Sequence, residues 1–178
     1  MNTSASLRMM VYASLFSALT AAGAFIAIPI PVTPVPIVLQ NLFVLLAGVI
    51  LGPKWGLASI GLYLFMGGMG FPVFAGGTGG FGRLFGPTGG YLLGYIPAVC
   101  VTGFLSDKLG GTRAGDAVAM VLGALIVYTA GVPWLHAATG MGWSKALAAG
   151  MYPFLIGDAL KISAGVLAAP VIRPLVKR

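Results

Sequence analysis

The chain has 178 residues, of which 58% are hydrophobic and only 7% are charged, whereas an ordinary soluble domain has about 25% charged residues. So few polar groups cannot cover a globular surface, which excludes a soluble domain and predicts one transmembrane domain over residues 1–178. The formal charge of +7 comes from scattered Lys and Arg residues. Their scatter argues against a nucleic-acid partner and fits the basic residues that flank membrane spans.

Apolar length and Gly/Pro punctuation predict an all-α integral membrane protein with six transmembrane helices. The first apolar stretch is interpreted as a membrane helix and not as a signal peptide, because it lacks a small-residue cleavage site. The second and third helices are short for a full span, and a re-entrant hairpin is the alternative for them. The six helices are expected at residues 8–28, 37–51, 55–70, 90–106, 115–135 and 146–172.

Two irregular segments interrupt these helices. Alternate prolines within residues 29–36 forbid helix and predict a rigid, extended first loop. Residues 67–90 are rich in glycine, so this segment is expected to fold back into a membrane cavity and present backbone amides to a ligand. The pattern G-x-x-x-x-G-K-[ST] occurs nowhere in the chain, so ATP hydrolysis by a phosphate-binding loop is not expected.

The basic residues predict the orientation of the helices. With six spans both termini lie on one side, and the opposite loops hold only Arg83 and Lys145. The side of the termini collects seven basic residues, which are Arg8, Lys54, Lys108, Arg113, Arg173, Lys177 and Arg178. The positive-inside rule therefore places both termini in the cytoplasm and the proline-rich and glycine-rich loops on the outer face.

Asp158 and Lys161 are the charged residues expected within the membrane. The other two acids, Asp107 and Asp116, are assigned to the polar turn after the fourth helix. A spacing of three residues puts Asp158 and Lys161 on one helix face, and each charge alone would cost at least about 2.5 kcal/mol in hydrocarbon. The pair predicts a substrate site toward the outer side, with a structural ion pair as the alternative.

Arg83 is the single charge of the glycine-rich segment and is a candidate clamp for a carboxylate. A headgroup contact or a loop staple is the alternative. Ser14, Ala18 and Ala22 are each four residues apart and form a stripe of small side chains on the first helix. Such a stripe allows close packing of another helix, either from a partner or from the same chain.

The sequence shows no constellation of residues for catalysis or for metal binding. His136 has no Cys or second His nearby, and Cys100 lies in an apolar segment. No Ser/His/Asp or paired-carboxylate arrangement is visible. The chain is therefore expected to be neither an enzyme nor a protein with a metal or another cofactor.

Four motifs, in order and spacing, resemble the BioY family of biotin-specific substrate-binding (S) components of energy-coupling factor (ECF) transporters. Residues 34–41 read PVPIVLQN and residues 76–80 read GGTGG. Residues 86–91 read GPTGGY, and residues 157–161 read GDALK. The resemblance covers nearly the whole chain.

The resemblance implies a six-helix S-component fold with an outward-facing biotin site and no cofactor beyond the transported biotin. It implies as partners a transmembrane coupling (T) protein and two cytoplasmic ATPases, in the cytoplasmic membrane of a bacterium or archaeon. Small residues of the first helix dock the coupling protein in that family, and Ala18 and Ala22 match them. A homo-oligomer is left open.

The resemblance also assigns biotin ligands to the Asp and Lys of the last motif. Some relatives carry Asn and Arg where this chain has Thr78 and Leu92, and Arg83 is the suggested replacement for that arginine. An Asp can accept from ureido N–H groups, a Lys can donate to the ureido carbonyl, and aromatic residues can line the middle. The predicted substrate-binding residues are Asp158, Lys161, Thr78, Arg83, Tyr91, Gln40 and Tyr128.

Two other functions stay open from the sequence alone. The first is an S component for another vitamin, such as thiamine or riboflavin. The second is a membrane scaffold without a ligand, in which Asp158 and Lys161 would only stabilise helix packing.

Overall fold

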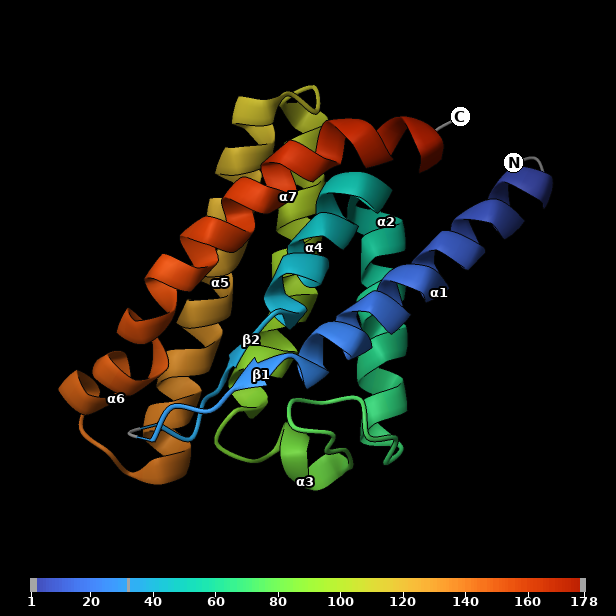
Figure 1. Cartoon of the computed structure of the whole chain (residues 1–178). Helices are drawn as coiled ribbons and strands as arrows, with labels where there is room; N and C mark the ends of the chain where they lie inside the picture. Colours follow the sequence, from blue (N-terminus) through green and yellow to red (C-terminus); the bar gives the residue numbers. More distant parts are fainter. Residues whose placement is uncertain (1–2, 32, 177–178) are drawn as a thin grey trace.

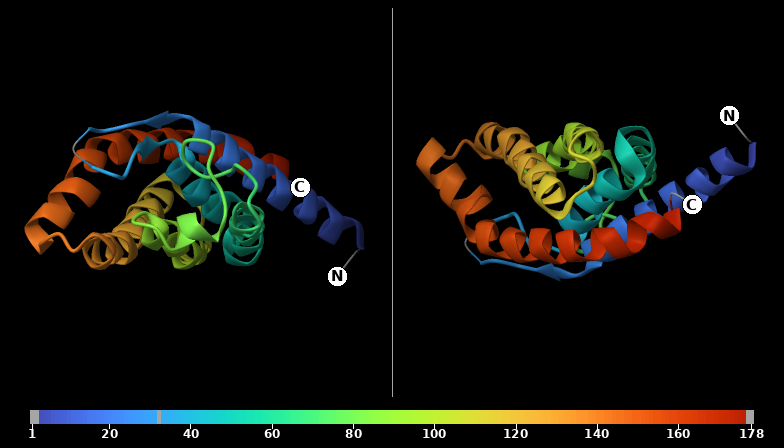
Figure 2. Two further views of the ribbon diagram at one scale, coloured as in Figure 1. Left: turned by 90° about the horizontal axis from the view of Figure 1, so that it is seen from below. Right: turned by 90° about the horizontal axis from the view of Figure 1, so that it is seen from above.

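Figure 1 shows the protein as a computed structural model, which describes residues 3–31 and 33–176. Its elements are α1 (Thr3–Phe25), β1 (Ala27–Ile28), β2 (Ile37–Val38), α2 (Gln40–Gly68), α3 (Phe81–Leu84), α4 (Gly89–Lys108), α5 (Arg113–Thr139), α6 (Trp143–Gly150), the 3₁₀ helix Tyr152–Phe154, and α7 (Leu155–Val176). Helices α2, α4 and α5 form a layer in which α4 packs against both others. Helices α1 and α7 lie on one face of that layer (Figure 2).

The core and the surface agree with a lipid environment. Side chains between α2, α4 and α5, such as Val49, Val99 and Met120, are fully buried, whereas large apolar residues such as Phe65, Leu160 and Val171 are exposed. Among the described residues, five helical segments are long and apolar enough to cross a membrane. They are 5–25, 40–68, 89–108, 113–139 and 143–176. The chain is therefore a multi-pass helical membrane protein.

The predicted helices 37–51 and 55–70 form one element, α2, which turns sharply at Gly52. Gly52 has φ +76° and ψ 178°, a conformation outside the helical region that glycine adopts without a steric penalty. A Cβ atom on Gly56 would lie 3.4 Å from the Cα of Gly48, so the two halves of α2 run side by side. Figure 1 shows the first half rising from β2 and the second half descending toward α3.

The described residues of the first loop, 29–31 and 33–36, contain no helix, as the prolines predict. β1 and β2 pair antiparallel, with Ala27 opposite Val38 and Ile28 opposite Ile37. Residues 37–38 are therefore strand and not the start of a helix, which begins at Gln40. The β1–β2 loop, α3 and α6 lie at one end of the molecule, and the start of α1 and the end of α7 lie at the other (Figure 1).

The predicted single helix 146–172 is wrong in its first part. The chain forms α6, then a 3₁₀ turn over Tyr152–Phe154, and only then α7. Pro153 sits in this turn, where its missing N–H and fixed φ are tolerated. The break sets Asp158 in the first turn of α7.

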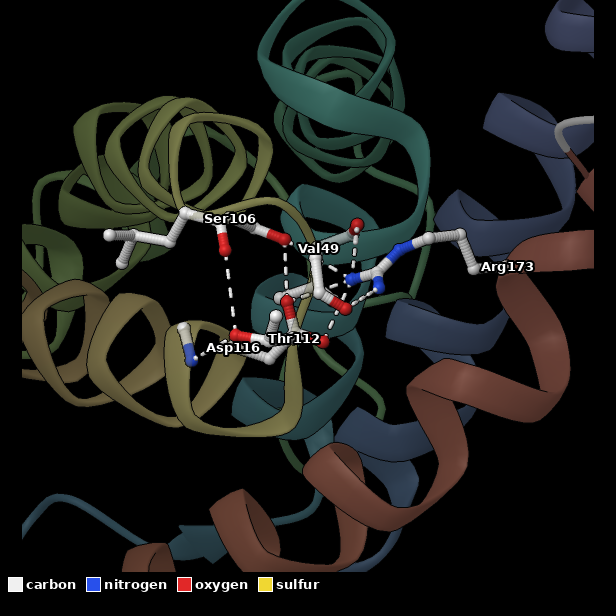
Figure 3. A network of polar contacts seen from close by, with 8 residues as sticks. Val49, Ser106, Thr112, Asp116 and Arg173 are labelled. Carbon is white, nitrogen blue, oxygen red and sulfur yellow. Dashed lines mark hydrogen bonds and ion pairs between the residues drawn. The ribbon is translucent and has the colours of Figure 1, made fainter.

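The expectation that Asp116 lies in an exposed polar turn is also wrong. Asp116 is fully buried in the first turn of α5. Nη2 of Arg173 donates to both of its carboxylate oxygens at 2.8 Å, and the Ser106 hydroxyl donates to Oδ1 at 2.6 Å (Figure 3). Arg173 also donates to the carbonyl oxygens of Gly111 at 2.5 Å and Val49 at 3.4 Å. This network joins the end of α7 to α2, α4 and α5, at the end of the molecule opposite the β1–β2 loop, α3 and α6.

Candidate functional site

A cavity opens at the end of the molecule that carries the first loop and the glycine-rich segment. It encloses about 470 Å³ not filled by protein atoms, a volume that includes its open mouth. Its walls come from the first loop, the glycine-rich segment and α4. The lining residues are Pro34, Val35, Pro36, Val38, Gln40, Phe74, Ala75, Arg83, Thr88, Tyr91, Leu92 and Tyr95.

A second cavity continues the first one toward α5 and α7. It shares Val35, Pro36, Val38, Tyr91 and Tyr95 with the first cavity, and it adds Asn41, Tyr128, Phe154 and Lys161. The two cavities therefore form one elongated site. Arg83 stands at one end of it and Lys161 at the other.

Lys161 of α7 lines the inner end of this site, and its partner Asp158 lines an adjoining cavity together with Lys161, Asn41 and Tyr95. Nζ of Lys161 lies 2.9 Å from Oδ1 of Asp158, and the two side chains are only 11% and 10% exposed. The Tyr128 hydroxyl donates to the other carboxylate oxygen, Oδ2. The prediction that Asp158 and Lys161 share one helix face is confirmed. Tyr128, predicted only as an aromatic wall, is a direct partner of the carboxylate.

Two tyrosines of α4 form the middle of the site. The Tyr91 hydroxyl donates to the carbonyl of Gly150 at 2.8 Å, which fixes the ring against the break before α7. Its ring passes over Gly131 of α5, where a Cβ atom would come within 2.3 Å of ring carbons. Tyr95, one turn further along α4, donates to Oδ1 of Asn41 at 2.6 Å. These contacts leave apolar ring faces toward the site.

Tyr95, Asn41 and Phe154 were missed as site residues in the sequence analysis. Tyr95 is four residues after Tyr91, and this spacing puts both rings on one face of α4. Asn41 follows Gln40 directly at the start of α2. The spacing was a usable signal for Tyr95, whereas the position of Phe154 depends on the 3₁₀ turn, which the sequence did not reveal.

Gln40 lies at the bottom of the first cavity with 1% of its surface exposed. Its side-chain nitrogen Nε2 has no hydrogen-bond partner among residues 3–31 and 33–176. Most buried polar groups in proteins are hydrogen-bonded. A hydrogen-bond acceptor on a bound ligand would give this nitrogen a partner.

Arg83 and Thr78 belong to a small polar cluster in the glycine-rich segment. The Thr78 hydroxyl donates to the carbonyl of Ala75 at 3.0 Å, and Nε of Arg83 donates to that hydroxyl at 2.8 Å. Arg83 lines the first cavity, whereas Thr78 is not among its lining residues. Thr78 therefore holds Arg83 in place, and direct contact of Thr78 with a ligand stays a prediction.

The stripe of small residues on α1 points outward. Ser14, Ala18 and Ala22 are all exposed, whereas the opposite face of α1 is buried through residues such as Ala13 and Phe16. The alternative that the stripe packs within this chain is therefore wrong, and the stripe is available to another molecule or to lipid. Among the described residues, no group of three His, Cys, Asp or Glu residues is placed to hold a metal ion.

The comparisons with known proteins identify the family of the chain. The model of the BioY family matches residues 1–178. The chain belongs to the BioY family. The BioY resemblance drawn from the four sequence motifs is therefore confirmed.

Curated BioY relatives come from both archaea and bacteria. A probable biotin transporter BioY of Pyrococcus horikoshii is 40% identical over 156 residues, which cover 88% of this chain and 90% of the relative. The biotin transporter BioY of Thermotoga maritima is 39% identical over 163 residues, which cover 92% of this chain and 94% of the relative. These BioY proteins are described as transporters and not as enzymes.

A solved BioY-like structure shares the whole fold. The crystal structure of the S-component for biotin from an ECF-type ABC transporter matches with a TM-score of 0.89 and 31% sequence identity. The match covers all of this chain and 95% of the other. The ECF S-component fold predicted for this BioY chain is thus supported over its full length.

Proposed function

We propose that this BioY protein is the substrate-binding component of a biotin uptake system. The observation that carries the proposal is the elongated site with Lys161, the ion-pair partner of Asp158, at one end and Arg83 at the other. Biotin has a ureido ring at one end, an apolar body and a carboxylate at the other end. Its chemistry matches the order of polar and apolar groups along the site.

The inner end of the site suits the ureido ring. Asp158 accepts N–H donors, Lys161 donates to the ring carbonyl, and Tyr128 holds the carboxylate of Asp158 from behind. The rings of Tyr91 and Tyr95 and the side chains of Pro36 and Val38 supply an apolar wall for the middle of the ligand. A wrong ligand leaves buried polar groups unpaired at about 1–3 kcal/mol each, which gives selectivity.

The membrane topology is part of the proposal. The two halves of α2 fold back at Gly52, so the five apolar segments supply six spans if each half crosses once. A Cβ atom on Gly52 would lie 3.0 Å from Oδ2 of Asp107 in the last turn of α4, so the bend reaches the end of the molecule at which α4 ends, which favours two crossings over a re-entrant hairpin. Both termini then lie in the cytoplasm, where the loop charges place them, and the ligand site opens outward.

The partners are a transmembrane coupling protein and two cytoplasmic ATPases, in the cytoplasmic membrane of a bacterium or archaeon. The exposed residues Ala18 and Ala22 on α1 support a helix-docking face for the coupling protein, because small side chains let two helices approach closely. Association of several copies of the chain is left to measurement.

A vitamin panel tests the proposal. The purified protein in detergent is titrated with biotin, thiamine and riboflavin while its thermal unfolding is followed. Biotin alone is expected to raise the melting temperature, because only a ligand that binds the folded state stabilises it. Stabilisation by thiamine or riboflavin without biotin would overturn the ligand, and stabilisation by none of them would favour a scaffold.

A further inference from the structure

The contact between α5 and α7 is polar at its two ends and apolar between them. At the ligand end the Tyr128 hydroxyl donates to Asp158, and at the opposite end Arg173 pairs with Asp116. The α5 residues between these contacts, 117–127, carry no polar side chain. Two polar contacts, roughly four helical turns apart, therefore hold α7 on α5.

A further cavity lies along this apolar stretch. It encloses about 290 Å³ not filled by protein atoms, a volume that includes its opening. This inner cavity shares Asn41, Tyr95 and Lys161 with the elongated site. It is also lined by Ala124 of α5 and Ile162 of α7, each of which is about one helical turn nearer to the Arg173 end than the charged pair. The inner cavity thus extends the ligand site toward that end.

Apolar packing alone separates the inner cavity from the next turn of α5 and α7. A Cβ atom on Gly165 would lie 2.5 Å from Cε of Met120 and 3.2 Å from Cδ1 of Leu42, so these three residues meet. Leu42 also lines the inner cavity, and Met120 is fully buried. Methionine side chains are unbranched and adapt to changes in packing. The directed bonds at this end of α7 are therefore those of Arg173.

Arg173 fixes the end of α7 to three other helices. Its Nη2 donates to both carboxylate oxygens of Asp116 at 2.8 Å, and its Nη1 donates to the carbonyl of Gly111 between α4 and α5 (Figure 3). Nη2 also lies 3.4 Å from the carbonyl oxygen of Val49 in α2. Asp116 is fully buried and the side chain of Arg173 is 15% exposed. Because a buried charge is unfavourable without its partner, this network is stable only when complete.

We propose that Arg173 is the latch of a gate between α5 and α7. While its bonds hold, α7 stays on α2, α4 and α5, and the inner cavity has no exit toward the Arg173 end. Release of Arg173 lets the end of α7 move away from α5, so that Met120 and Gly165 separate and the inner cavity opens. This inference rests on the proposed function for its direction: with both termini in the cytoplasm, the gate faces the cytoplasm.

Thiol labelling of membrane vesicles tests the latch without any ligand. Cys100 is the single cysteine of the chain, so Cys100→Ser removes the background, and Ala124→Cys places a thiol on the wall of the inner cavity. A membrane-impermeant methanethiosulfonate reagent is added to inverted or right-side-out vesicles. With Arg173 present, labelling from the cytoplasmic side is slow. Arg173→Met raises this rate by about tenfold or more, because the ion pair that favours the closed state is lost.

Matched variants separate a latch from a loss of stability. Asp116→Asn combined with Arg173→Met leaves no stranded charge, so it regains most of the melting temperature lost by Arg173→Met and keeps the fast labelling. Arg113→Met removes an exposed arginine from the same turn of α5 and leaves the rate unchanged. Ala114→Cys, at an exposed position of that turn, reports the side of the membrane on which the Arg173 end lies.

The outcomes keep this inference apart from the proposed function. Slow labelling in both the single and the double variant overturns the latch. Fast labelling that disappears in the double variant overturns it as well, because the opening then follows from the stranded charge. Labelling of Ala114→Cys from the outer side overturns the proposed topology, and absence of biotin binding by the wild type overturns the proposed function; neither result depends on the latch.

Discussion

Asp158 and Lys161 have two roles in this account, as partners of each other and as ligand contacts, and a double-mutant cycle separates them. Asp158→Asn leaves a nearly buried ammonium without its counter-charge, and Lys161→Met leaves a nearly buried carboxylate. Loss of one partner from a buried pair costs about 3–5 kcal/mol. The remaining one-tenth exposure lets the stranded charge reach water, so about 2–4 kcal/mol is expected here.

Thermal unfolding in detergent without ligand measures the stability side of the cycle. At about 2–4 °C per kcal/mol for a chain of this size, each single variant should melt about 4–16 °C below the wild type. The double variant strands no charge, so it should regain most of this loss. Lys145→Met is the control for removal of an exposed lysine and should leave the melting temperature unchanged.

Equilibrium binding of labelled biotin measures the effect of the same variants on ligand affinity. Each lost contact to the ureido ring should weaken binding about 10- to 150-fold, and the double variant should bind worst although it is stable. Recovery of stability without recovery of binding is the signature of a ligand site. If the double variant bound biotin as tightly as the wild type, the pair would be structural and the reasoning about the site would be refuted.

Three further predictions concern the rest of the fold. Ala18→Trp and Ala22→Trp should abolish uptake that depends on the ATPase module, while biotin binding in detergent is kept. Ala164→Trp, on the exposed side of α7, is the control and should leave both uptake and binding unchanged. Intact uptake in the α1 variants would contradict the docking face. Gly52→Ala should lower stability by about 1–3 kcal/mol, because φ +76° with ψ 178° is a backbone conformation open essentially to glycine alone, and an unchanged melting temperature would contradict this. Arg173→Met should lower stability by about 3–5 kcal/mol, because it leaves the buried Asp116 without its counter-charge, and biotin affinity should be retained. Arg113→Met, at an exposed position, should leave both stability and affinity unchanged.

The sequence was sufficient for the parts of the molecule that depend on composition and local spacing. Apolar length located the membrane helices, and the three-residue spacing paired Asp158 with Lys161. The proline pattern predicted a first loop without helix in its described residues, and four motifs identified the family. Each of these signals is carried by neighbouring residues or by a short motif.

Features that depend on long-range contacts were not predicted from the sequence. Asp116 was assigned to the polar turn because it closely follows the polar residues of that segment in the chain; its partner Arg173 is contributed by the other end of the protein. Tyr128 meets Asp158 only through the packing of α5 against α7. The fold-back at Gly52 was marked by Gly52 and Pro53, yet its tightness depends on the contact of Gly56 with Gly48.

A structure of the complex with biotin would locate the ligand directly. The ureido ring is expected against Asp158 and Lys161, the apolar body between Tyr91 and Tyr95, and the carboxylate toward Arg83. A ligand bound in the reverse direction would contradict the assignment of the two ends. A ligand bound away from the Asp158–Lys161 pair would contradict the site itself.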